Sequence, residues 1–350
     1  MFDALLWRWV PLAATLLLSG CSTLDYYSHL AGGQLQLLHA REPIAELLDE
    51  PTADPRLKQR LAMAQQARDF ASSQLSLPNN RSYRLYADIQ RPFVVWNVFA
   101  TAEFSLAPQL HCFPIAGCVA YRGFYSLGRA RGAAALLKQQ GLDTYMGGVE
   151  AYSTLGWFDD PILNTMLRWS DERLVAVIFH ELAHQQFYVA DDTAFNESFA
   201  SFVEHEGLRQ WQAKQGLPAS DPQGEQQREQ FSALVLASRA RLQQLYDSGL
   251  PPAQMRIGKQ AELARLRSEY RTLRDREWAG QGRYDDWINA PMNNAKLLPF
   301  GLYDQWVPAF AALFAQVGGN WPTFYQRVAA LGKLPETERQ QALQELSPGA

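Results

Sequence analysis

His180-Glu181-Leu182-Ala183-His184 decides the fold, because it closes an apolar run with helical character. Two histidines four residues apart on a helix lie about 40° apart around the axis and one turn along it. Both imidazoles can therefore reach one metal ion. The glutamate is turned about 100° away, so it borders the ion, where the activation of a water needs a general base. The alternative for this pentapeptide alone is a buried helix that packs two histidines.

A second helix downstream offers a third ligand, since catalytic zinc is commonly held by two histidines and one glutamate. Turn and capping residues at 190–193 precede the run Asn-Glu-Ser-Phe-Ala-Ser-Phe-Val-Glu at 196–204. Glu197 falls near the first turn of this helix, where the helix dipole favours a carboxylate. Glu204 lies seven residues on and on nearly the same face. It is the alternative ligand, or it hydrogen-bonds a ligand imidazole.

These two segments resemble the gluzincin metallopeptidases, and within them the zinc aminopeptidases, whose signature is HELAH followed by NExFA and a Phe/Tyr-Val/Met-Glu stretch. Here the chain reads HELAHQ and then NESFASFVE. The resemblance implies one zinc ion bound by His180, His184 and Glu197, with Glu181 as the catalytic base. Only 12 residues separate His184 from Glu197, fewer than in the best-known aminopeptidases, so the connection must be tight.

The fold class that we predict is α+β and mostly helical, with a zincin-like catalytic core. The strand patterns lie at 83–87, 92–101, 119–125 and 149–153. They predict a small sheet beside the motif helix, whose edge strand would offer backbone groups to an extended peptide.

The second half of the chain is predicted to be helical. A long polar stretch at about 222–276, split by Gly-Leu-Pro-Pro at 249–252, indicates a helical hairpin that is either a lid or a scaffold arm. Several shorter helices with many aromatic residues are expected over 284–346.

The amino-terminal segment resembles that of a bacterial lipoprotein. An apolar run at 10–18 is too short to span a bilayer and ends in Leu-Ser-Gly-Cys, with Cys21 last. This resembles a lipobox, which implies cleavage before Cys21 and its lipidation; an ordinary signal peptide is the alternative. Ser22 follows the cysteine, which by the lipoprotein rule favours the inner leaflet of the outer membrane, facing the periplasm.

Composition is consistent with one large domain. The 350 residues are 47% hydrophobic, the net charge is −4, and no Lys/Arg run suggests a nucleic-acid partner. We therefore divide the chain into a lipoprotein signal peptide at 1–20, a tether at 21–33 and a zinc metallopeptidase domain at 34–346.

Two further cysteines, Cys112 and Cys118, flank a turn-rich segment with a proline and a glycine. An exported chain folds in an oxidising compartment, so we expect a disulfide between them. Two free buried thiols are the alternative.

Glu150 is a candidate substrate-binding residue. It lies in Gly-Gly-Val-Glu-Ala at 147–151, which loosely resembles the edge strand of zinc aminopeptidases, whose glutamate binds the free amino terminus. Ala151 stands where that family has Asn, and a strand glutamate facing water is the alternative. Tyr303 and Tyr188 are candidate donors to the oxyanion of the reaction, although each could be a core tyrosine.

The sequence thus predicts a lipid-anchored, periplasm-facing zinc metallopeptidase that acts on peptides, and the resemblance favours an aminopeptidase. A zinc endopeptidase or quality-control protease of the cell envelope is the second hypothesis. A lipoprotein that binds peptides without cleaving them is the third, although a binding protein has no use for Glu181. The oligomeric state is left open.

Overall fold

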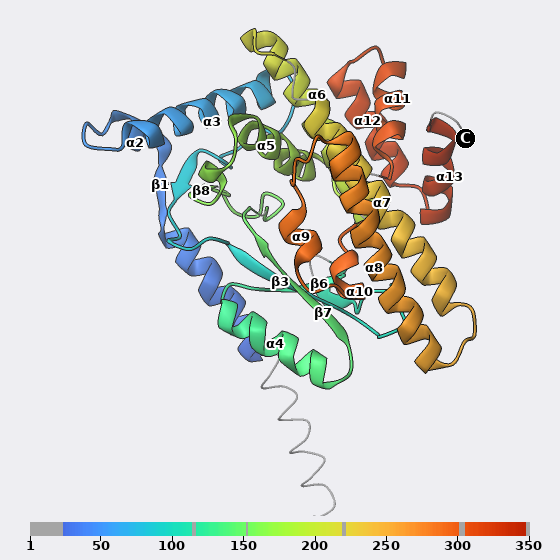
Figure 1. Ribbon diagram of the computed structural model, residues 1–350. Coiled ribbons are helices and arrows are strands. Elements are labelled where there is room, and N and C mark those ends of the chain that lie inside the picture. Colours follow the sequence, from blue (N-terminus) through green and yellow to red (C-terminus); the bar gives the residue numbers. More distant parts are fainter. Residues whose placement is uncertain (1–23, 114–116, 152, 219–221, 301–304, 348–350) are drawn as a thin grey trace, which may run out of the picture.

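The computed structural model describes residues 24–347 apart from 114–116, 152, 219–221 and 301–304. Over these residues the chain is mostly helical and carries small sheets (Figure 1). The expected α+β class, with helix predominating, is confirmed.

The strands are β1 (Arg41–Pro43), β2 (Leu85–Ala87), β3 (Val95–Thr101), β4 (His111–Phe113), β5 (Gly117–Val119), β6 (Tyr121–Phe124), β7 (Asp143–Val149) and β8 (Ile162–Leu163). The helices are α2 (Ile44–Asp49), α3 (Pro55–Ser73), α4 (Leu127–Gln139), α5 (Asp171–Gln186), α6 (Thr193–Gln215), α7 (Pro222–Tyr246), α8 (Pro252–Glu277), α9 (Asp285–Asn289), α10 (Asn294–Leu297), α11 (Val307–Gln316), α12 (Trp321–Gly332) and α13 (Glu336–Leu346), with a 3₁₀ turn at Met166–Arg168.

The sheet that matters for the site has the strand order β6-β3-β7 and is antiparallel throughout. Successive side chains of a strand point to opposite faces. Val98 and Phe124 lie on one face and pack with Ala130 of α4. Val95 and Asn97 lie on the other face and line a cavity in front of α5. One face of the sheet is therefore core, and the other is a wall of the candidate site.

One predicted strand is wrong in its position. The pattern at 149–153 indicated a strand, but the strand is β7, which ends at Val149. The two glycines of β7 lack the β-branched and aromatic side chains that mark a strand in sequence. Gly148 nevertheless pairs with Trp96 in the sheet, and the ring of Phe93 lies so close to it that an added Cβ would be 2.4 Å from the ring.

Part of the segment that we expected to be a tether is helical. Residues 24–39 form a helix, and residues 21–23 lie outside the described residues. Tyr26 is 6% exposed and packs with Phe124, while its hydroxyl donates to the carbonyl of Gly123 at 3.0 Å. Gly33 lets the helix lie directly against the ring of Tyr125. Burial of a few well-spaced side chains holds this helix on the domain, which the small-residue composition concealed.

The two helices that carry the motifs lie side by side in the main core. Ser170 accepts a hydrogen bond from the backbone N–H of Arg173 at the start of α5, and Asp192 accepts one from Phe195 at the start of α6. Such caps satisfy N–H groups that a helix start leaves unpaired. The chain thus leaves α5 at Gln186 and enters α6 at Thr193, beside the turn and capping residues that the sequence indicated at 190–193.

The predicted helical hairpin is confirmed as α7 and α8 (orange-yellow in Figure 1). Lys259 of α8 donates to a carboxylate oxygen of Asp143 at 2.5 Å and to the carbonyl of Glu103 at 2.8 Å. The Asn294 amide donates to the carbonyls of Glu103 and Ser105 at 2.9 and 3.0 Å. These buried bonds fix α8 and α10 to the sheet, as expected of a scaffold arm.

None of the helices in the described part of the chain combines the length and the apolar character that crossing a bilayer requires.

Candidate metal centre and cleft

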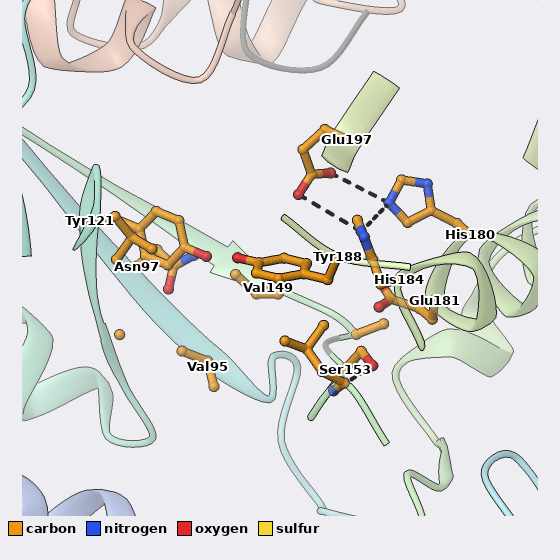
Figure 2. Close-up of a pocket in the computed structure, with 14 residues that line it drawn as sticks. Val95, Asn97, Tyr121, Val149, Ser153, His180, Glu181, His184, Tyr188 and Glu197 are labelled. Atoms are coloured by element: carbon orange, nitrogen blue, oxygen red, sulfur yellow. Dashed lines mark hydrogen bonds and ion pairs between the residues drawn. The ribbon is translucent and has the colours of Figure 1, made fainter. Parts of the chain in front are cut away.

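Helix α5 places His180 and His184 one turn apart, and α6 places Glu197 opposite them (Figure 2). The two Nε2 atoms lie 3.2 Å apart. A carboxylate oxygen of Glu197 lies 3.4 Å from Nε2 of His180, and the other lies 3.8 Å from Nε2 of His184. With one donor atom taken from each residue, all three donors lie within 4.8 Å of one another, so the group could hold a metal ion.

These separations fit a tetrahedral metal. Metal–ligand bonds of about 2.0–2.1 Å place two corners of a tetrahedron about 3.3–3.4 Å apart. The pairs at 3.2 and 3.4 Å are close to this edge, whereas the 3.8 Å separation is longer and involves the other carboxylate oxygen of Glu197. Two imidazole nitrogens and one carboxylate oxygen are also the donor types that zinc takes in catalytic sites. This donor set could therefore hold a metal ion.

Glu204 meets His180 at its other nitrogen. A carboxylate oxygen of Glu204 lies 2.9 Å from Nδ1 of His180, whereas Glu197 faces Nε2. A carboxylate that accepts the Nδ1 proton fixes the tautomer and orientation of the ring and leaves Nε2 free as a ligand atom. The structure thus gives the two glutamates different positions: Glu197 among the donor atoms and Glu204 behind one imidazole.

Burial and charge dominate the ionisation of this cluster. Burial lowers the pKa of His180, but hydrogen bonds to Glu197 and Glu204 outweigh it and hold that pKa well above its usual range. Burial lowers the pKa of His184 to about 4, and the neighbouring His180 contributes. Hydrogen bonding to His180 overcomes burial and lowers the pKa of Glu197 and Glu204. The partly exposed carboxylates of Glu197 and Glu204 thus favour positive charge beside them, which a divalent cation can supply in place of a proton.

Glu181 lines the same cavity as the histidines, on the side turned away from Glu197 in Figure 2. Burial raises the pKa of Glu181 to about 7, and the positive charge of His180 opposes this shift. A carboxylate with such a pKa can take up and release a proton near neutrality, as a general base must.

The tight connection between the helices depends on Asn196, whose side chain is 1% exposed. Its oxygen accepts from the N–H of Val189 at 2.8 Å, and its nitrogen donates to the carbonyl of Val189 at 2.7 Å. This pair of bonds folds the connection back onto α6 next to Glu197. Asn196 belongs to the motif NESFASFVE, but its structural role depends on contacts with Val189 that the sequence does not show.

A cavity of about 470 Å³ opens in front of these residues (Figure 2). Its walls are the face of the β6-β3-β7 sheet, the segment after β7 and the start of the connection between α5 and α6. The described residues that line it are Val95, Asn97, Val119, Tyr121, Gly123, Val149, Ala151, Ser153, Leu155, His180, Glu181, His184, Tyr188 and Glu197.

Two tyrosines line this cavity. Burial raises the pKa of Tyr121 to about 12, with a further contribution from the charge of Glu197, and the same two causes raise the pKa of Tyr188. Both hydroxyls therefore stay protonated and can donate hydrogen bonds. Tyr188 was a sequence candidate. Tyr121 was missed, because its place on the cavity face depends on strand pairing. Tyr303 lies outside the described residues, as does Cys21.

Glu150 does not line the cavity, although its neighbours Val149 and Ala151 do. Its carboxylate accepts a hydrogen bond from the indole N–H of Trp169 at 2.7 Å and lies 3.4 Å from the guanidinium of Arg173. The structure therefore brings this substrate-binding candidate to the start of α5 and not to the metal ligands.

Cys112 and Cys118 are joined in the structure, across the β4–β5 pair. The N–H of Cys118 donates to a carboxylate oxygen of Asp191 at 2.8 Å. The disulfide hairpin thus rests on the turn between α5 and α6, and Val119 at its end lines the cavity.

Comparison with known proteins finds a family. A family model with the description "Putative aminopeptidase" matches residues 25–343 of the chain. No curated protein matches the chain, and neither does any solved structure.

Proposed function

Because the chain belongs to this aminopeptidase family, which supports a peptidase function in general, we propose that it is a zinc-dependent aminopeptidase. The observation that carries the proposal is the convergence of His180, His184 and Glu197 beside Glu181 at one cavity. Both histidines and Glu181 come from one helix, which is the H-E-x-x-H arrangement of many zinc metalloproteases.

His180, His184 and Glu197 would hold the zinc. When bound, the ion supplies polarisation of the scissile carbonyl and a lower pKa for the attacking water. Glu181 accepts the proton of that water and passes it to the leaving amine. Glu204 holds the ring of His180 through Nδ1. The hydroxyls of Tyr121 and Tyr188 are the candidate donors to the developing oxyanion.

The charge of the cavity supports action at an amino terminus. Among the described lining residues there is no Lys or Arg, whereas Glu181 and Glu197 are both present. With Glu197 neutralised by the proposed zinc, a substrate carboxylate would still find no basic side chain to pair with, and Glu181 remains as a carboxylate that an ammonium group could approach. This argues for a free amino end near the metal and against a free carboxyl end.

A zinc endopeptidase is a second candidate, and one observation favours it. Glu150, the carboxylate expected to bind the substrate amine, is paired with Trp169 and Arg173. An enzyme without a dedicated group for the amine could cleave within a chain. Hydrolysis of N-acetylated peptides at rates equal to those of free-amine peptides would establish this alternative and contradict the aminopeptidase proposal.

The activity test uses purified protein and a pair of peptides that differ only in N-acetylation. We expect hydrolysis of the free-amine peptide and release of its first residue, detected by mass spectrometry. Glu181→Gln should lower kcat by roughly 10²–10⁴-fold because the general base is lost, while metal analysis shows an unchanged zinc content. Full activity of Glu181→Gln would refute the proposed role of this residue.

We also propose that Cys21 carries a lipid and anchors the protein to the outer membrane, facing the periplasm. This rests on the lipobox-like sequence that ends at Cys21. Cys21→Ser should move the protein from the membrane to the soluble fraction of lysed cells, whereas Cys118→Ser should not. Retention of the Cys21→Ser protein in the membrane would contradict the anchor.

A further inference from the structure

Asn97 is a polar residue on a largely apolar sheet face. It lies in the middle strand β3, between Val95 and Phe99 on the same face, and its half-buried side chain lines the cavity. Within the described part of the chain, no hydrogen bond involves its side-chain amide. The amide faces the cavity, where water can pair with it until a ligand that offers both a donor and an acceptor replaces that water. A partner from outside the chain would satisfy it.

Glycines flank Asn97 on both neighbouring strands. In the sheet register, Asn97 is opposite Gly123 of β6 and Gly147 of β7, which places the three residues in one row on one face. A Cβ at Gly123 would lie 3.3 Å from the side-chain oxygen of Asn97 and 3.1 Å from Cγ1 of Val95. A side chain there would crowd the amide. In the row Gly147–Asn97–Gly123, which we call the glycine strip, Asn97 and Gly123 line the cavity, and the missing side chain of Gly123 leaves the amide open to a ligand on that side.

We propose that the glycine strip binds the main chain of a peptide substrate beyond its scissile bond, with the Asn97 amide paired to one peptide unit. An asparagine side chain offers two donors and one acceptor, which complement the carbonyl and N–H of a peptide unit. An ammonium group has donors only and would leave the nitrogen of Asn97 without a partner. The chemistry of the strip therefore matches a peptide group better than a free amine.

The position of the strip gives the substrate class. Figure 2 shows Asn97 across the cavity from Glu197 and His180. This inference rests on the proposed function: in an aminopeptidase only one residue precedes the scissile bond, so a chain that reaches Asn97 extends past the metal site on its carboxyl side. The substrate class is therefore a peptide of three or more residues, and an aminoacyl amide does not engage the strip.

The test compares two substrates on one variant, Asn97→Leu. Leucine has nearly the shape of asparagine, cannot pair with a peptide, and suits an apolar face, so the fold is retained. We expect kcat/KM for a free-amine tetrapeptide to fall about tenfold, the loss for two ordinary hydrogen bonds, while an aminoacyl p-nitroanilide changes less than about twofold. Zinc content should stay the same. Asn79→Leu, at an exposed turn position, is the matched control and should change neither substrate.

Two results with Asn97→Leu would overturn the proposed role of the glycine strip: an unchanged kcat/KM for the tetrapeptide, or an equal loss of kcat/KM for both substrates. If the unaltered protein hydrolyses no peptide, the proposed function fails, and binding still tests the strip. Calorimetry would then titrate the tetrapeptide into Glu181→Gln and into Glu181→Gln with Asn97→Leu. A roughly tenfold weaker affinity in the double variant supports the strip. Equal affinities, or no binding to either variant, overturn it.

Discussion

Two glutamates of α6 meet His180 at different nitrogens, and this difference is the basis of the different roles that we propose for them. Glu197 faces Nε2 and also approaches His184, whereas Glu204 contacts only Nδ1 of His180 among the metal-site histidines. A ligand contributes directly to the binding of the ion. A carboxylate behind a ligand acts through the ring, and its loss typically costs about 10–100-fold in metal affinity.

Metal analysis of two matched variants can test these roles. Glu197→Ala should abolish near-stoichiometric zinc in the purified protein, as His184→Ala should. Glu204→Ala should still bind zinc, with an affinity about 10–100-fold weaker in a competition titration with a chelator. Both changes shorten a glutamate on the same helix, so each is the control for the other. Full zinc in Glu197→Ala together with its loss in Glu204→Ala would reverse the assignment.

The close approach of α6 to α5 depends on a glycine. A Cβ at Gly207 would lie 2.7 Å from a methyl carbon of Leu75 and 2.9 Å from the ring of Phe179 on α5. Both of these side chains are buried, so neither can move aside easily. The distance between the metal-binding helices is therefore set in part by the missing side chain.

Gly207→Ala should lower the free energy of unfolding by about 1–3 kcal/mol, because overpacking outweighs the helix preference of alanine. Gly132→Ala in α4 is the control, since nothing lies within 4 Å of its added Cβ. That change should stabilise the protein by about 0.5–1 kcal/mol. Urea unfolding followed by circular dichroism measures both. Stabilisation by Gly207→Ala would show that the helices are not in tight contact there.

The hairpin of α7 and α8 is joined to the rest of the molecule by buried polar bonds. Lys259 and Asp143 form an ion pair whose side chains are 11% and 19% exposed. The same Asp143 carboxylate accepts from the N–H of Asn294 at 2.9 Å. A movable lid would have to break these bonds at each opening, so the hairpin is better suited to hold the sheet in place.

Lys259→Met should lower the free energy of unfolding by about 3 kcal/mol, since Asp143 then loses its buried partner. Hydrogen exchange should rise in α8 for the same reason. The control is Arg265→Met on the same helix, whose pair with Glu269 is 56% exposed at the arginine; it should cost less than about 1 kcal/mol. Equal small effects for the two variants would mean that the pair does not fix the hairpin.

Local sequence pattern was sufficient to predict the helices whose ends and apolar faces are set by neighbouring residues. Helices α5 and α6 are visible in the sequence through caps, apolar spacing and the turn at 190–193. The hairpin can be predicted because a short segment that contains two prolines, 249–252, separates two long helical stretches. Pattern failed at β7 and at the helix over 24–39, where glycines and small residues carry little local preference and distant aromatic rings such as Phe93 and Phe124 decide the structure.

The sequence by itself determined the chemistry: two histidines and a glutamate on one helix, a candidate third carboxylate on the next, and two cysteines able to pair. Their spacing is a property of the helix and the chain, so no distant contact is needed to infer it. Only the tertiary structure decided which atoms meet. Helix packing places Glu197 and Glu204 at different nitrogens of His180 and pairs Glu150 with Trp169. Strand register places Asn97 and Tyr121 on the cavity wall. Those are long-range interactions, which no short stretch of sequence contains.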